Sequence, residues 1–210
     1  MTDPIAFSAL LCSRLCHDLI SPVGAFTNGL EILQDETDAT MREQVVELLE
    51  QSASQTSNRL QFFRLAFGAA GGFGETVAMD SARDAAAAFF SGGKVMLEWR
   101  PAVQELSKDG LKALLNLVLV AGEALLRGGR LTVEGGRSNG ALELVIHAEG
   151  ERLMLKPEME EVLGGRVAQA DLTPKTAPAY LASIAAAAAG GGVDVRRVGE
   201  NSVTLLLRLP

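Results

Sequence analysis

The sequence predicts two long helices followed by an α+β domain, in which helices cover a mainly antiparallel sheet. In the first 35 residues, apolar side chains are spaced alternately four and three positions apart, which is typical of helices in a bundle. A glycine-rich stretch, residues 68–74, then ends this pattern. Beyond it, short apolar runs suited to strands alternate with helical runs, which favours an α+β fold.

The first helix is expected over residues 5–33, and its apolar positions form one continuous seam. The members of this heptad seam are Cys12, Cys16, Leu19, Val23, Phe26, Leu30 and Leu33. A second helix is expected over residues 39–67, with Asp38 as its N-cap. Two helices of similar length joined by a short turn should form an antiparallel hairpin. A single hairpin has a small core, so we expect two copies of the chain to form a homodimeric four-helix bundle.

The glycine-rich stretch divides the chain into two predicted domains, residues 1–68 and residues 75–210. In the second domain, strands are expected at residues 75–79, 94–100, 130–134, 141–147, 193–198 and 202–209. Helices are expected at residues 81–90, 157–163 and 178–189, and from an N-cap at Ser107 to residue 126.

The overall composition argues against several classes of function. The 210 residues are 48% hydrophobic and carry a net charge of −7. No cluster of Lys and Arg is present, which argues against a nucleic-acid partner. No apolar run reaches the roughly 18 residues of a membrane span, and the N-terminus lacks the basic start of a secretory signal. Cys12 and Cys16 are the only cysteines and lie one helical turn apart, which fits a reduced, cytoplasmic protein.

His17 lies in the first predicted helix, away from the heptad seam. On a helical wheel, its side of the helix carries mostly polar and small residues, which predicts that the imidazole is exposed. We expect partners to dock on this polar stripe, whose other members are Ser13, Arg14, Ser21, Gly24, Asn28 and Glu31. The small polar side chains of residues 51–58 in the second helix should lie level with His17, where they form either a weakly packed polar face or an open surface for a docking partner.

An exposed imidazole followed by a carboxylate is suited to phosphoryl transfer. The unprotonated ring is a good nucleophile near neutral pH, and Asp18 can orient it or act as a base. The alternative, a surface histidine without a role, stays open at this point. His147, at the end of a predicted strand, is expected to have no chemical role. Cys12 and Cys16 beside His17 suggest a metal or haem site only superficially, since buried seam residues explain them better.

Residues 15–23, Leu-Cys-His-Asp-Leu-Ile-Ser-Pro-Val, resemble the H-box of sensor histidine kinases. In that motif, a phospho-accepting His is followed by Asp or Glu and then by Leu or Ile, with a polar residue and Pro further on. The domain order is also similar, because these kinases place a dimerising helical hairpin before an ATP-binding α/β sandwich of the Bergerat type. The resemblance covers nearly the whole chain and implies that His17 and Asp18 are the catalytic residues.

The second domain departs from the kinase pattern at the positions that bind nucleotide. The asparagine that would coordinate Mg²⁺ falls at Val120, and the aspartate that would bind adenine falls at Ala148. The second glycine of the aspartate motif falls at Arg152, and both glycines of the phosphate loop are lost in residues 177–180. Backbone approach to a triphosphate depends on such glycines. We therefore expect the scaffold to remain and ATP binding to be absent.

A kinase-like dimer with these losses resembles the ChpT-type histidine phosphotransferases of bacterial phosphorelays, and so does the stretch of residues 60–68. The resemblance implies that a phosphoryl group passes through His17 between the receiver aspartate of a hybrid histidine kinase and response regulators. It also implies no cofactor bound by this chain, because the receiver would supply Mg²⁺. Two alternatives stay open: an autophosphorylating histidine kinase with divergent nucleotide motifs, and a non-catalytic dimeric adaptor that binds receivers.

Overall fold

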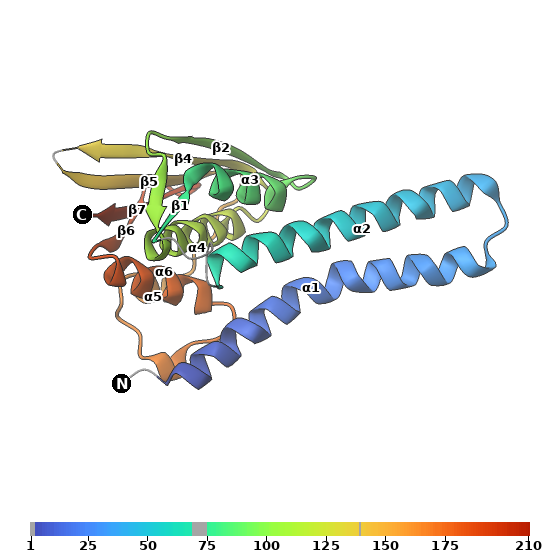
Figure 1. Ribbon diagram of the computed structural model, residues 1–210, viewed down its shortest axis with the longest axis horizontal. Coiled ribbons are helices and arrows are strands. Elements are labelled where there is room, and N and C mark those ends of the chain that lie inside the picture. The colour runs from blue at the N-terminus through green and yellow to red at the C-terminus, as the bar shows by residue number, and fades with distance from the viewer. Residues whose placement is uncertain (1–2, 69–74, 139) are drawn as a thin grey trace.

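Two long helices, α1 (Pro4–Asp35) and α2 (Ala39–Ala66), form an arm that extends away from the rest of the chain in the computed structural model (Figure 1). The structure describes residues 3–68, 75–138 and 140–210. Apart from Gly68, the predicted linker lies outside the described residues. Within the described part, no helix is both long and apolar enough to cross a membrane.

Local side-chain bonds fix where the two arm helices begin. Asp3 caps α1 by accepting hydrogen bonds from the backbone N–H groups of Ile5 at 3.0 Å and Ala6 at 3.2 Å. Asp38 caps α2, as the sequence predicts, by accepting from the N–H of Met41 at 2.9 Å. The two helices run side by side in opposite directions, joined by the turn at residues 36–38 (Figure 1).

Small residues allow α1 and α2 to approach each other closely. A Cβ atom built on Gly29 would lie only 2.8 Å from Cδ2 of Leu49, so only glycine fits there without a shift of the Leu49 side chain. The buried residues along this part of the arm are Pro22, Gly29, Val45, Leu49 and Ser52.

Most of the heptad seam does not contribute to this contact. Val23 and Leu30 are exposed in the single chain, and so are Cys12 and Cys16. The expectation that the two cysteines are buried is therefore wrong for the single chain. The physical reason is that heptad spacing marks an apolar face of a helix without stating which element covers that face.

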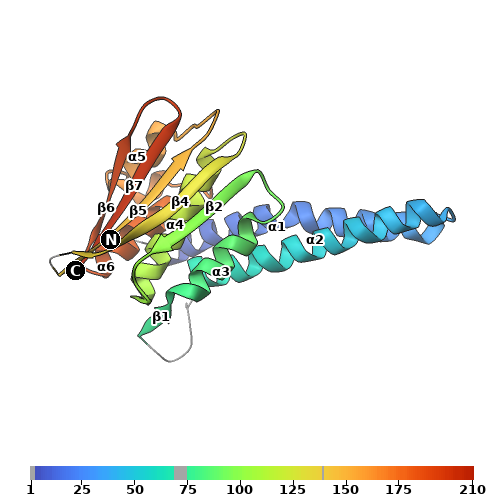
Figure 2. The ribbon, with the colours of Figure 1, turned by 90° about the horizontal axis from the view of Figure 1, so that it is seen from above.

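Beyond the arm, helices cover one face of a five-stranded sheet with strand order β2-β4-β5-β7-β6 (Figures 1 and 2). Its strands are β2 (Val95–Pro101), β4 (Gly129–Ser138), β5 (Ala141–Glu149), β6 (Gly192–Arg197) and β7 (Ser202–Leu209). The pair β2–β4 is parallel and the other three pairs are antiparallel, which confirms the mainly antiparallel sheet. The helices are α3 (Met79–Phe90), α4 (Lys108–Ala124), α5 (Pro157–Leu163) and α6 (Ala177–Ala188), with a 3₁₀ turn at Gln169–Asp171. A separate antiparallel pair joins β1 (Thr76–Ala78) to β3 (Glu105–Ser107), and β3 was not expected from the sequence.

Helix α4 lies at the centre of this region. It begins where the Ser107 side chain accepts a hydrogen bond from the N–H of Gly110 at 3.1 Å, as predicted. Most of its side chains are buried, and those of Leu111 and Leu114 are fully enclosed. Because so little of α4 faces water, its orientation is set by packing on all sides.

The base of the arm shares the core of the C-terminal region. Phe62 and Phe63 of α2 belong to the same cluster of buried residues as α4 and the sheet. Asn116 of α4 is fully buried, and its Nδ2 donates to the backbone oxygen of Ala66, at the end of α2, at 2.8 Å. Near the start of α1, the Phe7 ring packs edge-on against Tyr180 of α6 at a centroid distance of 5.1 Å. The arm is therefore anchored at the end where His17 lies.

Candidate active site

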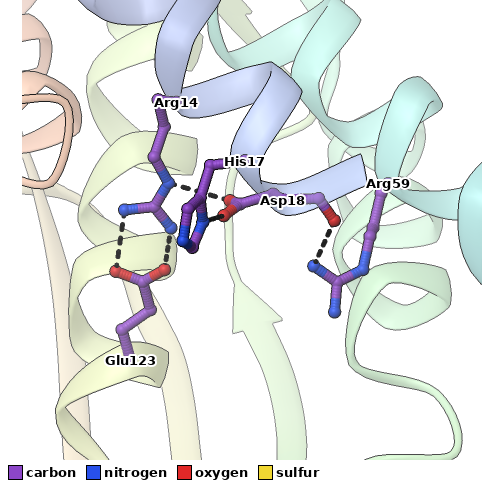
Figure 3. A network of polar contacts seen from close by, with 5 residues as sticks. All are labelled: Arg14, His17, Asp18, Arg59 and Glu123. Carbon is purple, nitrogen blue, oxygen red and sulfur yellow. Dashed lines mark hydrogen bonds and ion pairs between the residues drawn. The ribbon is translucent and has the colours of Figure 1, made fainter. Parts of the chain in front are cut away.

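His17 projects from α1 beside the junction of the arm with α4 (Figure 3). Its side chain is 85% exposed, in agreement with the helical wheel. The ring Nδ1 lies 3.1 Å from Oδ1 of Asp18, so one ring nitrogen is held by a carboxylate. The other nitrogen, Nε2, has no hydrogen-bond partner among the described residues. The histidine thus presents one orientated nitrogen to the solvent.

The side chain of Asp18 is held more tightly than that of His17. Only 10% of its side chain is exposed, and its Oδ2 accepts a hydrogen bond from Nε of Arg14 at 2.8 Å. Its backbone oxygen accepts from Nη1 of Arg59, on α2, at 3.1 Å. The guanidinium of Arg59 also lies over the ring of Phe89 at 5.8 Å. The carboxylate that contacts His17 is therefore fixed by Arg14 of its own helix, while α2 holds the backbone at Asp18.

Arg14 links this site to α4. It is only 7% exposed, and its Nη1 donates to Oε2 of Glu123 at 3.3 Å while Nη2 contacts Oε1 of the same carboxylate (Figure 3). Burial alone would lower the pKa of this guanidinium, but the carboxylates of Glu123 and Asp18 outweigh it and raise the pKa above its ordinary value. The ion pairs thus keep a buried cation charged next to the histidine.

A cleft of about 570 Å³ opens beside His17. Its walls come from α1, from Glu123 of α4, and from the loop that precedes α6. The lining residues are Ser13, Arg14, His17, Asp18, Glu123, Thr173, Pro174 and Lys175. Lys175 is exposed and brings a positive charge to the side of the cleft opposite α1. The candidate site is therefore shared by the arm and the C-terminal region.

The polar stripe is mostly where the wheel places it. Four of the predicted docking residues are exposed, namely Ser13, Ser21, Asn28 and Glu31. Gly24 is half-buried, and a Cβ atom there would meet nothing within 4 Å. Arg14 is the exception, because its ion pairs with Asp18 and Glu123 bury it. Arg14 holds the carboxylate of Asp18 in place and does not offer an exposed docking group.

Comparisons with known proteins identify relatives of this chain. Residues 79–201 match the family described as "Histidine phosphotransferase C-terminal domain". The chain is 35% identical over 208 residues to "Protein phosphotransferase ChpT" of Brucella abortus (strain 2308), covering 97% of this chain and 98% of that protein. This chain belongs to the histidine phosphotransferase family.

Two solved structures show how far the likeness of this histidine phosphotransferase extends. A bacterial phosphotransferase determined at 1.7 Å resolution superposes with a TM-score of 0.86 at 32% identity, over 98% of this chain and 97% of that one. The histidine kinase domain of the Erythrobacter litoralis EL346 blue-light activated histidine kinase superposes with a TM-score of 0.51 at 12% identity, over 90% and 95% of the two chains. The second match shows a shared fold alone.

Two of the positions that the kinase resemblance assigns to nucleotide binding are apolar and buried in this histidine phosphotransferase. Val120 of α4 is 3% exposed and Ala148 of β5 is fully buried. The space beside Val120 is a cavity of about 110 Å³, lined in part by Met154 and Met159. Typical ligand pockets measure roughly 300 to 1,000 Å³. The cavity next to Val120 is thus small for a nucleotide.

Several residues of the site were not anticipated from the sequence, among them Arg59, Glu123 and Lys175. Arg59 immediately precedes residues 60–68, the stretch that the family resemblance singles out, and nothing local indicates that it contacts Asp18. Glu123 and Lys175 come from segments more than a hundred residues away from His17. No periodic pattern connects such distant positions, so only the folded chain reveals them.

Proposed function

We propose that this chain carries a phosphoryl group on His17 between the aspartates of receiver domains in a phosphorelay. The observation that carries the proposal is the histidine itself: it is 85% exposed, with Nδ1 held 3.1 Å from Asp18 and Nε2 open to solvent. Membership of the histidine phosphotransferase family supports the same reaction. The upstream partner is the receiver of a hybrid histidine kinase, and the downstream partners are response regulators.

In the reaction, the phosphoryl group moves from an aspartate oxygen of the receiver to a ring nitrogen of His17. Nε2 of His17 attacks the phosphorus of an aspartyl phosphate, the new N–P bond forms, and the P–O bond to the receiver carboxylate breaks. The ring gains positive charge as the bond forms, and the carboxylate of Asp18 at Nδ1 stabilises it. Transfer to the next receiver reverses these steps. Mg²⁺ would come with the receiver, and this chain supplies the nucleophile, its orientation and the carboxylate beside Nδ1.

The exposed polar stripe and the adjoining cleft form the docking surface for the receiver. Ser21 and Asn28 are exposed on the same side of α1 as His17, and Gly24 leaves open space between them. The cleft of about 570 Å³ can admit a loop of the receiver beside the histidine. Lys175 can there meet the negative charge of the phosphoryl group.

We further propose that the chain is a homodimer with a four-helix bundle formed by two arms. Large apolar side chains exposed on the arm include Ile20, Val23, Leu30, Ile32, Met41, Val46, Leu48 and Leu60. So many exposed apolar groups on one element indicate a covered surface. In light-scattering measurements we expect twice the chain mass, and we expect Leu30→Asp to yield the monomer. A wild-type chain that is monomeric at micromolar concentration would refute the dimer.

The decisive experiment follows labelled phosphate onto the chain. A receiver domain phosphorylated with labelled acetyl phosphate should transfer its label to the wild-type protein and not to His17→Ala. His147→Ala is the matched control and should accept label normally, because His147 lies on the sheet with Nδ1 3.0 Å from Thr204. Transfer that survives in His17→Ala excludes His17 as the carrier. Binding of the receiver without any transfer to the wild type favours the adaptor.

Independence from ATP is part of the proposal. Buried Val120 and Ala148 provide no side chain for Mg²⁺ or adenine, and the nearby cavity of about 110 Å³ is small. Titration with ATP and Mg²⁺ should therefore show no binding at millimolar concentration, and γ-labelled ATP should leave His17 unlabelled. Measurable affinity or labelling would favour the autophosphorylating kinase.

A further inference from the structure

We propose that Glu123 is a positioning residue for phosphotransfer, and that it acts on His17 through Arg14 and Asp18. The inference rests on the proposed role of His17 as phosphoryl carrier. It assigns to α4, which comes from the kinase-like part of the chain, an indirect part in orienting the nucleophile. The contacts form a continuous path from Glu123 to the imidazole (Figure 3).

The guanidinium of Arg14 is divided between two carboxylates. Its Nε donates to Oδ2 of Asp18 at 2.8 Å, while Nη1 and Nη2 both contact the carboxylate of Glu123. A guanidinium prefers to bind one carboxylate with two parallel hydrogen bonds. Glu123 holds the guanidinium by its two terminal nitrogens, and in this orientation Asp18 receives a single bond from Arg14, through Nε. The other oxygen of Asp18, Oδ1, is thereby left for Nδ1 of His17 at 3.1 Å.

Removal of Glu123 would change how the hydrogen bonds of Arg14 are shared between the two carboxylates. Arg14 is only 7% exposed and would keep Asp18 as its sole acidic partner, so a two-bond pair with Asp18 becomes the favoured arrangement. Such a pair draws Oδ1 of Asp18 away from the imidazole. His17 then loses the partner that fixes its tautomer and stabilises the charge on the ring.

The location of Glu123 is not explained by the stability of its own helix. It lies in the last turn of α4, where the partial negative charge of the helix end disfavours a carboxylate. Its side chain is 35% exposed, so water could solvate it, yet it turns to Arg14 on α1. The attraction to Arg14 offsets the unfavourable position, which is consistent with a role outside α4.

The test compares Glu123→Gln and Glu123→Asp with the wild type, and uses Glu143→Gln as the matched control. Glu143 pairs with Arg208 on the sheet and is 52% exposed, so its substitution removes the same charge far from α1. The donor is phosphoramidate, a small molecule that phosphorylates histidine directly: the N–P bond to His17 forms, the bond to the donor nitrogen breaks, and ammonia leaves. Because no receiver takes part, the rate reports on the imidazole and not on docking.

We expect Glu123→Gln to label His17 about tenfold more slowly, with partial recovery in Glu123→Asp and no change in Glu143→Gln. Nitrogen-15 spectra of the histidine rings provide a second measurement. The His17 nitrogens should shift toward those of a mixed tautomer in Glu123→Gln, while His147 stays unchanged and serves as the internal reference. Thermal unfolding of each variant shows whether the fold is preserved.

The possible outcomes separate this inference from the proposed function. If phosphoramidate labels the His17→Ala variant as strongly as the wild type, the proposed function fails whatever Glu123 does. If labelling requires His17 but Glu123→Gln matches the wild type in rate and ring spectrum, the positioning role is refuted and the function stands. A slower rate with an unchanged His17 spectrum also refutes the path through Asp18.

Discussion

Gly24→Phe tests the proposed docking surface without disturbing the fold. Gly24 lies two helical turns beyond His17, about 10 Å along the axis of α1, on the same side of the helix. A standard protein interface covers about 800 Å² on each partner, so a receiver centred on His17 must cover Gly24. A Cβ atom at Gly24 meets nothing within 4 Å, and the aromatic ring therefore projects into the space that the receiver occupies.

The size of each effect follows from this geometry. Replacing a helical glycine by phenylalanine should stabilise the helix by about 0.5 kcal/mol. The melting temperature should consequently stay the same or rise by about 1 to 2 °C. The apparent Kd for the receiver should rise at least about tenfold, equivalent to about 1.4 kcal/mol. Labelling by phosphoramidate should be unaffected, because this donor needs no docking surface.

The assay measures single-turnover transfer from a phosphorylated receiver over a range of receiver concentrations, with Glu143→Phe as the control. Glu143 is an exposed strand residue on the sheet, away from the arm, and accepts an aromatic side chain readily. An unchanged Kd in Gly24→Phe would show that receivers dock elsewhere. A parallel loss of phosphoramidate labelling would show that the ring disturbs His17 itself, which would equally refute the steric explanation.

Two predictions concern the packing that supports the site. Gly29→Ala should destabilise the protein by about 1 to 2 kcal/mol in chemical unfolding, because overpacking against Leu49 outweighs the better helix propensity of alanine. Gly24→Ala is its control on the same helix and should be neutral or slightly stabilising; equal effects would contradict the packing argument. Asn116→Ala should cost about 2 kcal/mol, since the backbone oxygen of Ala66 loses a buried hydrogen bond. Full stability of that variant would show that this bond does not hold α2 to α4.

Most elements of the fold could be predicted because their signals are local. Asp38 and Ser107 cap helices through bonds to backbone groups only three residues away. Both bounds of α5 (Pro157–Leu163) match the expectation, since proline suits a helix start and glycine follows its end. Strand β3 (Glu105–Ser107) has only three residues and exists through its pairing with β1, so no local pattern could indicate it.

The candidate site was predictable only where it depends on helix geometry. A helical wheel places His17 and Ser21 on an exposed face, because successive residues of a helix are separated by a fixed angle. The same wheel places Arg14 on that face and fails there, since its burial depends on Glu123, 109 residues further along the chain. Ion pairs between residues far apart in the sequence leave no periodic pattern, and they decide which side chains of the polar stripe stay exposed.

The packing also gives the C-terminal region a structural role that does not depend on nucleotide. Helix α4 places Val120 in the core, at the position where the kinase resemblance expects a metal-binding asparagine. One turn further, Glu123 points out of that core toward Arg14 of α1. Two turns before Glu123, Asn116 donates to the backbone oxygen of Ala66 at the end of α2. Loss of α4 would therefore remove the carboxylate of Glu123 from Arg14 and the core from the base of the arm. A histidine on an isolated arm would keep its exposure but lose the contacts that orient it.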